Sequence, residues 1–417
     1  MKPINQTIAH LKPSGIRKYF DLANSMEGVI SLGVGEPDFD TPWHISAKAV
    51  ESFEDVHTHY TANRGLIALR KQIAGYYHSR YGIDYDPQSE ILVTVGGSEA
   101  VDLCCRTLIS PGDEVIVLDP NYVAYEPAIL MAGGVPVRIE LTQDNDFKLL
   151  PEDLERAIND HTKAIILNFP SNPTGGVMTR EDYERVVPIL KESGIYVISD
   201  EIYSELLFEG EFCSPANFEQ IRDQVLVING FSKAFAMTGW RLGYLLSNAD
   251  LSQQLTKVHQ FVIMSAPTSA QYAAIEALEH GIADTESMRR EYESRRNLIC
   301  ARLNRMGLTT NVPKGTFYVF TNITSSGLTS DEFCVRLLEE HKVAIVPGTA
   351  FGDSGEGFVR ISYATSMENI KEACSRIEAF LESLHLPSES VDSHHGSHSL
   401  HSASPPSQIP DGRGRAH

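Results

Sequence analysis

A lysine and an arginine stand in a stretch of the chain that is otherwise mostly small or apolar, NGFSKAFAMTGWRLGY (229–244). Lys233 lies between Ser232 and Ala234, and Arg241 follows eight residues later. An ammonium group in apolar surroundings loses hydration, which favours its neutral, nucleophilic form. Such a lysine can attack an aldehyde and form a Schiff base. The stretch therefore predicts a reactive amine beside a second cation that also needs a partner.

Strands and helices that position these groups are predicted from the apolar pattern. Continuous apolar runs are typical of strands buried on both faces of a largely parallel sheet. Seven such runs occur, at 91–96, 114–119, 135–141, 164–169, 196–201, 225–230 and 243–247. Helical patterns lie between many of them, and one, 179–193, opens at the N-cap candidate Thr179. The pattern predicts an α/β fold in which a mostly parallel sheet is covered by helices.

Polar residues follow several of these strands, where open α/β sheets bind their ligands. Gly96 and Gly97 lead into a helix with Ser98, and exposed N–H groups at such a point suit an anion. Alone, these residues are explained as a tight turn with Ser98 as N-cap. Asn172, in SNPTGG, is likewise explained as part of a turn.

An acid, Asp200, stands at the end of a buried strand, where it is costly unless a cation or several donors face it. Tyr203 follows it, and the next strand leads to Lys233. A single ligand that serves all these groups needs an anion, a cationic group and an electrophile. Pyridoxal phosphate has a phosphate, a pyridine nitrogen and an aldehyde, so the residues themselves favour this cofactor.

Composition excludes several other classes of protein. The 417 residues are enough for two domains, and the formal charge of 35 minus 55, or −20, argues against nucleic acid and anionic membranes as partners. Six cysteines without a CxxC pair or metal-ligand spacing are typical of reduced thiols. The N-terminus lacks the apolar region of a signal peptide, and no run is long enough to span a membrane. We expect a soluble, cytoplasmic protein without a metal site.

The chain divides into four predicted parts. An N-terminal arm (1–45) is expected to join the smaller domain, a large cofactor-binding domain follows (46–290), and a small α+β domain comes next (291–386). The tail (387–417) is rich in Ser, His, Pro and Gly and is predicted to be disordered, because it has too little apolar surface to offset its ordering entropy. Its histidines could bind a metal, but a solvated tail is favoured.

Four motifs in this order, SNPTGG, SDEIYSELLF, FSKAFAMTGWRLGY and GFVRISYA, closely resemble those of the fold-type I, class I/II aminotransferases. The resemblance extends from about Ser14 to about Leu386. The early segments VISLGVGEPDFDTP and HYTANRGLIALR look like the subgroup of aspartate and archaeal aromatic aminotransferases. The resemblance implies the aspartate aminotransferase-like fold, with three layers around a seven-stranded sheet, and pyridoxal phosphate as cofactor.

The resemblance assigns roles around the cofactor ring. Lys233 looks like the Schiff-base lysine that later moves a proton. Asp200 resembles the partner of the pyridine nitrogen, a contact that should lower the pKa of its carboxyl group. Asn172 and Tyr203 resemble the donors to the 3-oxygen of the ring. Tyr122 sits where the family stacks an aromatic ring, although a core tyrosine remains the alternative.

Four residues match the family's phosphate-binding positions and are named the phosphate cradle: Gly97, Ser98, Ser232 and Arg241. Glu99, the next residue of the same helix, is included among the expected cofactor-binding residues. Gly230 departs from the family pattern, because a phosphate-binding serine is common there. Ser232 and Arg241 are therefore expected to carry more of the phosphate binding.

Other matching residues concern the substrate and a partner subunit. Arg360 resembles the arginine that grips the substrate α-carboxylate with two parallel bonds, and Gly35 and Asn172 are expected beside it. Tyr60 matches a residue that reaches the partner's cofactor phosphate, which implies a homodimer. The segment GVGEPDF is no dinucleotide fingerprint, because Asp38 replaces the third glycine and no strand–helix context surrounds it.

The resemblance implies ping-pong transamination between an L-amino acid and a 2-oxo acid. Ser98 replaces a lysine that often helps aspartate-type relatives to bind a distal carboxylate. We therefore expect an aromatic or broad amino-donor specificity, with 2-oxoglutarate as acceptor, over an aspartate or alanine aminotransferase. A carbon–sulfur lyase or an aminocyclopropanecarboxylate synthase-like enzyme on the same cofactor is the alternative. A regulatory cofactor-binding module is disfavoured, because only about 45 residues precede the predicted large domain and they contain no basic helix-turn-helix.

Overall fold

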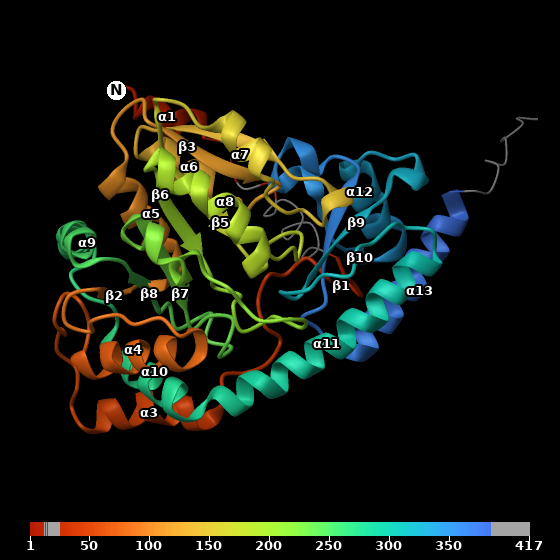
Figure 1. Ribbon diagram of the computed structural model, residues 1–417. Coiled ribbons are helices and arrows are strands. Elements are labelled where there is room, and N and C mark those ends of the chain that lie inside the picture. The colour runs from red at the N-terminus through yellow and green to blue at the C-terminus, as the bar shows by residue number, and fades with distance from the viewer. Residues whose placement is uncertain (12, 14, 16–25, 385–417) are drawn as a thin grey trace, which may run out of the picture. The chain divides into compact units, whose positions relative to one another are not determined.

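A computed structural model describes residues 1–11, 13, 15 and 26–384 (Figure 1). The tail predicted to be disordered, 387–417, lies outside the described residues. Within the described part of the chain, no helix combines the length and the apolar composition that a membrane span requires.

Seven strands form the large sheet, in the order β2-β8-β7-β6-β5-β3-β4. Their bounds are Ile91–Thr94 (β2), Glu114–Asp119 (β3), Val135–Glu140 (β4), Thr162–Asn168 (β5), Tyr196–Asp200 (β6), Val225–Gly230 (β7) and Gly243–Leu246 (β8). Only β8 runs antiparallel to its neighbours β2 and β7, and the other pairs are parallel. The predicted seven-stranded, mostly parallel sheet is confirmed, and each strand falls on one of the seven apolar runs.

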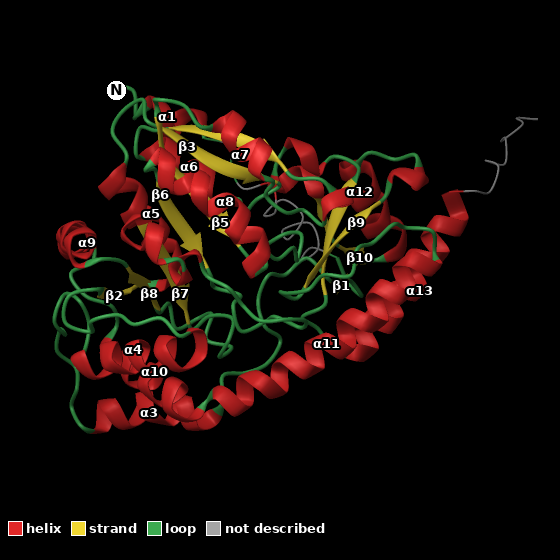
Figure 2. Cartoon of the chain, in the orientation of Figure 1, coloured by secondary structure: helices red, strands yellow, loops and turns green. Residues whose placement is uncertain are grey.

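Both faces of the sheet are buried, because successive side chains of each central strand enter different apolar cores. In β5, Ile165 and Leu167 pack in one core, whereas Ala164 and Ile166 pack in the other. Figure 2 shows the strands lying between helices. The three-layer α/β architecture that the sequence and the resemblance implied is confirmed.

Helices cover the two faces of this sheet. They are α3 (Trp43–Glu54), α4 (Ile67–Tyr81), α5 (Gly96–Leu108), α6 (Tyr125–Met131), α7 (Pro151–Ala157), α8 (Arg180–Ser193), α9 (Ala249–Val262) and α10 (Thr268–His280); a short helix α1 (Gln6–His10) lies near the N-terminus. Thr179 is the N-cap of α8, as predicted: its side chain accepts the N–H of Asp182, and the Asp182 carboxylate accepts the N–H of Thr179.

A smaller antiparallel sheet, in the order β11-β12-β9, has its own apolar core. Its strands are β9 (Tyr318–Asn322), β11 (Val346–Pro347) and β12 (Phe358–Ser362), and α12 (Ser330–His341) and α13 (Met367–Leu384) pack beside it. Two short strands follow each other in the apolar segment 343–348: β10 (Val343–Ala344) pairs with β1 (Ile30–Ser31), whereas β11 pairs with β12.

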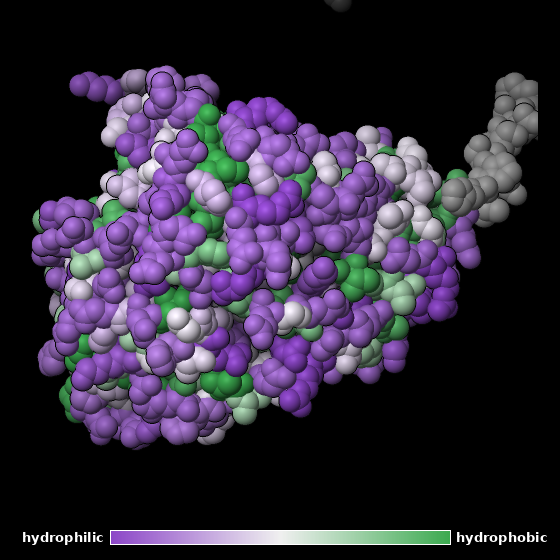
Figure 3. All heavy atoms as spheres, in the orientation of Figure 1, coloured by the Kyte–Doolittle hydropathy of each residue, from purple (hydrophilic) through white to green (hydrophobic). Residues whose placement is uncertain are grey.

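One long helix, α11 (Ile282–Arg305), runs without a break through the predicted boundary between the large and small domains at 290/291. The described residues up to Leu384 form one compact unit, so the domain boundaries stay a prediction. Hydrophilic side chains predominate on the face of the molecule seen in Figure 3, with small apolar patches among them.

Candidate active site

A cavity of about 440 Å³ lies beside the carboxyl ends of β5, β6 and β7. The register of these strands brings their last residues together, since Asn168 pairs with Asp200 and Asp200 with Ile228. Eleven residues singled out in the sequence line the cavity: Gly35, Gly97, Ser98, Tyr122, Asn172, Asp200, Tyr203, Ser232, Lys233, Arg241 and Arg360. Segments that are far apart in the chain thus meet at one site.

Asp200 is almost completely buried and is held by three neighbours. Its carboxylate accepts the Tyr125 hydroxyl at 2.7 Å and the N–H of Ile202 at 3.2 Å, while its carbonyl oxygen accepts the Asn168 amide. Burial raises the pKa of Asp200, and the bond from Tyr125 and the charge of Lys233 offset only part of this effect. The expected lowering of this pKa is therefore not produced by the chain's own residues, and it depends on a cationic ligand.

Lys233 extends its ammonium group to the carbonyl oxygen of Gly35, 2.6 Å away. Burial lowers the pKa of Lys233 to about 8, and the carboxylate of Glu36 partly opposes this shift. The apolar setting in the sequence predicted this direction. At a pKa of about 8, about a fifth of the amine is neutral near pH 7.4, far more than for a free lysine, and the neutral form is the one that acts as a nucleophile or a base.

Arg360 is 3% exposed and faces the same cavity from β12. Nη1 donates to the Asn172 side-chain oxygen at 2.9 Å and Nη2 to the carbonyl oxygen of Gly33 at 2.7 Å. Nε is buried without a hydrogen-bond partner among the described residues. The guanidinium carbon lies 4.3 Å from the ring centre of Tyr318, and burial lowers the pKa of Arg360. This cation retains unused capacity for an anion.

Two tyrosines that the sequence did not single out belong to the site. Tyr125 bonds Asp200, and Tyr318 shares a 3.0 Å hydrogen bond with the Tyr203 hydroxyl. A Cβ atom on Gly35 would come within 2.7 Å of the Tyr318 hydroxyl, so only glycine fits there. The sequence signal for Tyr125 was its place in NYVAYEP, three residues after Tyr122; nothing local distinguished Tyr318.

Close backbone packing shapes the phosphate cradle. Gly96, which opens α5, has a φ of +72°, and a Cβ atom there would lie 2.8 Å from Nη2 of Arg241. A Cβ atom on Gly243 would lie 2.7 Å from the carbonyl carbon of Gly96. Gly230 pairs with Gly243 across β7 and β8, and a Cβ atom on it would lie 2.9 Å from the Gly243 Cα. This contact explains why Gly230 departs from the serine that is common in the family.

Two of the expected cofactor-binding residues do not line this cavity. The Glu99 carboxylate bonds His259 at 2.6 Å and the N–H of Val95, so it is engaged elsewhere. Tyr60 is 82% exposed, outside its own cavity. Its expected contact with a partner subunit stays a prediction.

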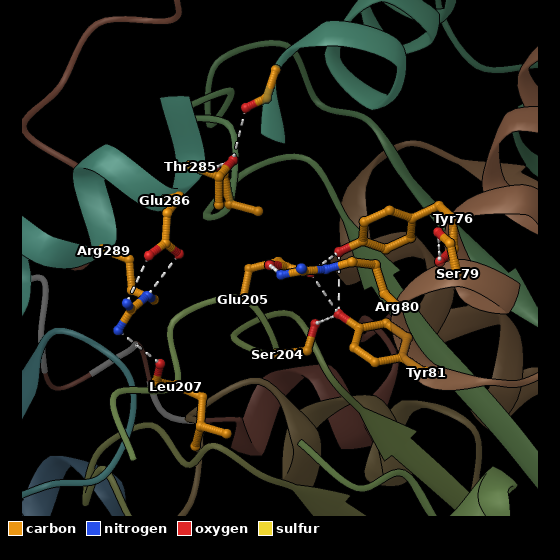
Figure 4. Close-up of polar contacts among 12 residues, drawn as sticks. Tyr76, Ser79, Arg80, Tyr81, Ser204, Glu205, Leu207, Thr285, Glu286 and Arg289 are labelled. Carbon is orange, nitrogen blue, oxygen red and sulfur yellow. Dashed lines mark hydrogen bonds and ion pairs between the residues drawn. The ribbon is translucent and has the colours of Figure 1, made fainter. Parts of the chain in front are cut away.

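A polar network holds the segment that follows Tyr203 (Figure 4). Tyr76, Arg80 and Tyr81 of α4 converge on the buried carboxylate of Glu205. Tyr81 also donates to the Ser204 hydroxyl, which accepts the Asn229 side-chain amide at the end of β7. The network therefore ties α4 to the two strand ends that carry Tyr203 and Lys233.

A second anchor acts next to the lysine. The hydroxyl of Thr285, near the start of α11, donates to the carbonyl oxygen of Ala234 at 2.7 Å. Figure 4 also shows Glu286, the next residue of α11, bonded to Arg289 about one turn further along the helix. The backbone beside Lys233 is thus fixed to α11.

The residues around the cavity fit pyridoxal phosphate by their chemistry. The phosphate cradle offers backbone N–H groups, a hydroxyl and a guanidinium to an anion, Asp200 offers a carboxylate to a cation, and Lys233 offers an amine to an aldehyde. The fold and this donor set together define a pyridoxal phosphate-dependent enzyme with the aspartate aminotransferase-like fold.

Comparisons with known proteins agree with this class. The family model described as "Aminotransferase class I and II" matches residues 27–377. The aromatic-amino-acid aminotransferase 2 of Thermococcus litoralis is 42% identical over 382 residues, which cover 91% of this chain and 98% of that protein. The aspartate aminotransferase of Pyrococcus abyssi is 43% identical over 374 residues, 89% of this chain and 96% of that protein.

A solved structure, the aromatic aminotransferase from Pyrococcus horikoshii OT3, superposes with a TM-score of 0.84 at 41% identity, covering 88% of this chain and 99% of that one. The chain belongs to the aminotransferase class I and II family. It is an aminotransferase that uses pyridoxal phosphate, as the resemblance implied. The lyase and synthase alternatives are not favoured.

The lowered pKa of Lys233 makes its reactivity testable without any cofactor. We expect acetylation of Lys233 by acetic anhydride, followed by mass spectrometry of the cofactor-free protein, to reach half its maximal rate near pH 8. Only the neutral amine reacts, so acetyl-lysine in the same solution should keep gaining reactivity up to about pH 10.4. Glu36→Gln should move the Lys233 midpoint to lower pH, because Glu36 stabilises the ammonium form. Parallel profiles for Lys233 and acetyl-lysine would contradict the lowered pKa.

Proposed function

We propose that this aminotransferase moves the amino group of an aromatic L-amino acid, or of a broad range of L-amino acids, to 2-oxoglutarate by a ping-pong mechanism. Pyridoxal phosphate supplies an electron sink for the carbanion at Cα and carries the amine between the two half-reactions. Binding, orientation and proton transfer are then left to the chain's own residues.

Lys233 would hold the cofactor through its aldehyde, and its amine would accept the proton from Cα of the substrate. Its lowered pKa supports this role, because a general base works best when its pKa lies near the working pH. Asp200, oriented by Tyr125, holds a proton on the pyridine nitrogen. Tyr203 and Asn172 would donate to the ring oxygen, and Tyr122 would pack against the ring; all three line the cavity.

Arg360 binds the α-carboxylate of the substrate, with Gly35 and Asn172 beside it. The unpartnered Nε atom of Arg360 supports this role, since an unused buried donor is costly until an acceptor reaches it. The cofactor phosphate lies in the phosphate cradle, where Arg241 provides the charge.

The apolar lining of the cavity carries the proposed substrate class. Its wall between α5 and α6 includes the small and apolar side chains of Val101, Ala124, Ala128 and Met131. The one carboxylate that α5 adds to this lining, that of Asp102, is paired with Arg106. Ser98 occupies the position at which a lysine would favour a distal carboxylate. An aromatic side chain gains free energy by covering such a wall, whereas the carboxylate of aspartate gains none.

We propose a homodimer in which Tyr60 reaches the cofactor phosphate of the partner subunit. Several large apolar side chains that soluble monomers seldom expose together support it. They lie on α3, in the segment after it and at the end of α9: Trp43, Phe53, Tyr60, Phe261 and Met264. Two hydrogen bonds tie the loops together, from Asn63 to the Met264 carbonyl and from Thr268 to the His59 carbonyl, which fixes Tyr60 on a supported loop.

We propose a cytoplasmic location, supported by the cysteines. All six are buried, free thiols, as expected in a reducing compartment. We also propose the parts 1–45, 46–290 and 291–386 as arm, large domain and small domain, supported by the separate core of the smaller sheet.

A panel of amino donors with 2-oxoglutarate tests the substrate class. We expect Phe and Tyr to give kcat/KM at least about tenfold above that of Asp, because the apolar wall rewards only the larger side chains. Ala and Lys complete the panel, glutamate formation is the readout, and Lys233→Ala is the inactive control. A clear preference for Asp would refute the aromatic or broad specificity while leaving transamination intact.

Arg360→Ala is expected to raise KM about tenfold to hundredfold for every amino acid, the cost of a lost charge-assisted interaction. Cofactor affinity, measured by equilibrium dialysis, should change little, because Arg360 is assigned to the substrate. Arg360→Lys should recover part of the loss. An unchanged KM in Arg360→Ala would remove this residue from carboxylate binding.

Phe261→Glu should convert the proposed dimer to a monomer in light scattering, because Phe261, at 88%, is the most exposed of the five side chains assigned to the contact. Val312→Glu is the matched control, since Val312 is also exposed, at 50%, but lies outside this group. Equal masses for both variants and the parent protein would argue against an interface at this face.

A further inference from the structure

A buried acid–histidine pair lies directly behind the phosphate cradle. Nδ1 of His259, on α9, is 2.6 Å from one carboxylate oxygen of Glu99 in the first turn of α5. The His259 side chain is 0% exposed and that of Glu99 7%. Neither residue lines the cavity, so neither can touch the cofactor through its side chain.

The second carboxylate oxygen of Glu99 accepts the N–H of Val95, the residue before α5. The first four N–H groups of a helix have no partner within it, and here these belong to Val95, Gly96, Gly97 and Ser98. Glu99 satisfies the first of them. Of the other three, those of Gly97 and Ser98 belong to residues that line the cavity and remain for an anion there.

The negatively charged Glu99 and the phosphate compete for the same helix N–H groups, and His259 limits this competition. A carboxylate is attracted to the positive end of a helix, which is also where the phosphate cradle lies. A Glu99 side chain free to turn would compete with phosphate for the same N–H groups. The short bond from His259 keeps the carboxylate on the side away from the cavity.

A histidine at position 259 would lower the stability of the fold if it served only for packing. Its other ring nitrogen, Nε2, is buried with no hydrogen-bond partner among the described residues. Such an atom loses its bond to water without replacement, whereas an apolar side chain would carry no such penalty. The histidine therefore needs a task beyond filling space, and its bond to Glu99 supplies one.

We propose that Glu99 and His259 are positioning residues for the cofactor phosphate. His259 restrains Glu99, and the restrained Glu99 takes the Val95 N–H and leaves those of Gly97 and Ser98 to the phosphate. The inference rests on the proposed placement of the phosphate in the phosphate cradle. It also reassigns Glu99, which acts through the helix and not by contact with the cofactor.

The first experiment measures the affinity of the protein for pyridoxal phosphate and for pyridoxal, which lacks the phosphate. In His259→Leu, pyridoxal phosphate should bind about tenfold more weakly, the size of one hydrogen bond to a charged group, while pyridoxal binding stays unchanged. His259→Asn places an amide donor near the position of Nδ1 and should retain most of the affinity. Equal losses for both ligands, or the same loss in both variants, would overturn the proposal.

A double variant separates positioning from simple packing. If the freed Glu99 competes with phosphate, His259→Leu combined with Glu99→Gln should bind pyridoxal phosphate more tightly than His259→Leu alone. A merely structural role predicts the opposite, because a second buried contact is lost. Asp182→Asn is the matched control: Asp182 is also a first-turn carboxylate that accepts its N-cap N–H and pairs with a cation, Lys148, but it lies outside the cavity. It should leave both affinities unchanged.

Arg241→Ala distinguishes failure of the inference from failure of the proposed function. It should weaken pyridoxal phosphate but not pyridoxal. If Arg241→Ala leaves the affinity for pyridoxal phosphate unchanged, the phosphate binds elsewhere. The proposed placement of the phosphate and the proposed role of the Glu99–His259 pair are then both refuted. If Arg241→Ala weakens binding while His259→Leu does not, only the role of the Glu99–His259 pair is refuted.

Discussion

Ionisable groups buried at the carboxyl ends of β5, β6 and β7 must either find partners or lose their charge, and the site is arranged around this constraint. Lys233 responds by a lowered pKa, and Asp200 by a raised pKa and a bond from Tyr125. Arg360 spends two of its donors on Asn172 and Gly33 and keeps Nε free. The chain therefore leaves part of the charge and hydrogen-bonding capacity of these side chains without a partner. A ligand of complementary charge binds well in such a site.

The sequence was sufficient for the sheet because each of its strands is a continuous apolar run, a pattern that needs no knowledge of neighbours. It was also sufficient for residues such as Lys233 and Asp200, since polar groups directly after buried strands meet at one edge. Hydrogen-bond partners from distant segments of the chain could not be predicted from the sequence. Tyr318 is 115 positions from Tyr203, and His259 is 160 from Glu99, so packing alone brings them together.

The direction in which each side chain points was the other property that could not be predicted from the sequence. Glu99 follows Ser98 in the helix that opens the phosphate cradle, and sequence proximity suggested a cofactor contact. A helix turns by about 100° per residue, however, so neighbouring residues point to different sides. The pKa of Asp200 is a different case: contact with the pyridine nitrogen was expected to lower it, but among the chain's own residues the cost of burial, already indicated by its place after a buried strand, is the larger effect and raises it.

Helix α11 has a mechanical consequence. It is pinned near its start, where Thr285 bonds the carbonyl oxygen of Ala234 beside Lys233, and its later turns pack against α13 and β9 of the small sheet that carries Arg360. Its 24 residues make a rod of about 36 Å. A rotation of one degree about the pinned end moves the far end by roughly 0.6 Å. A tilt of α11 by a few degrees about its anchor beside Lys233 would therefore change the distance between the Lys233 amine and the Arg360 guanidinium.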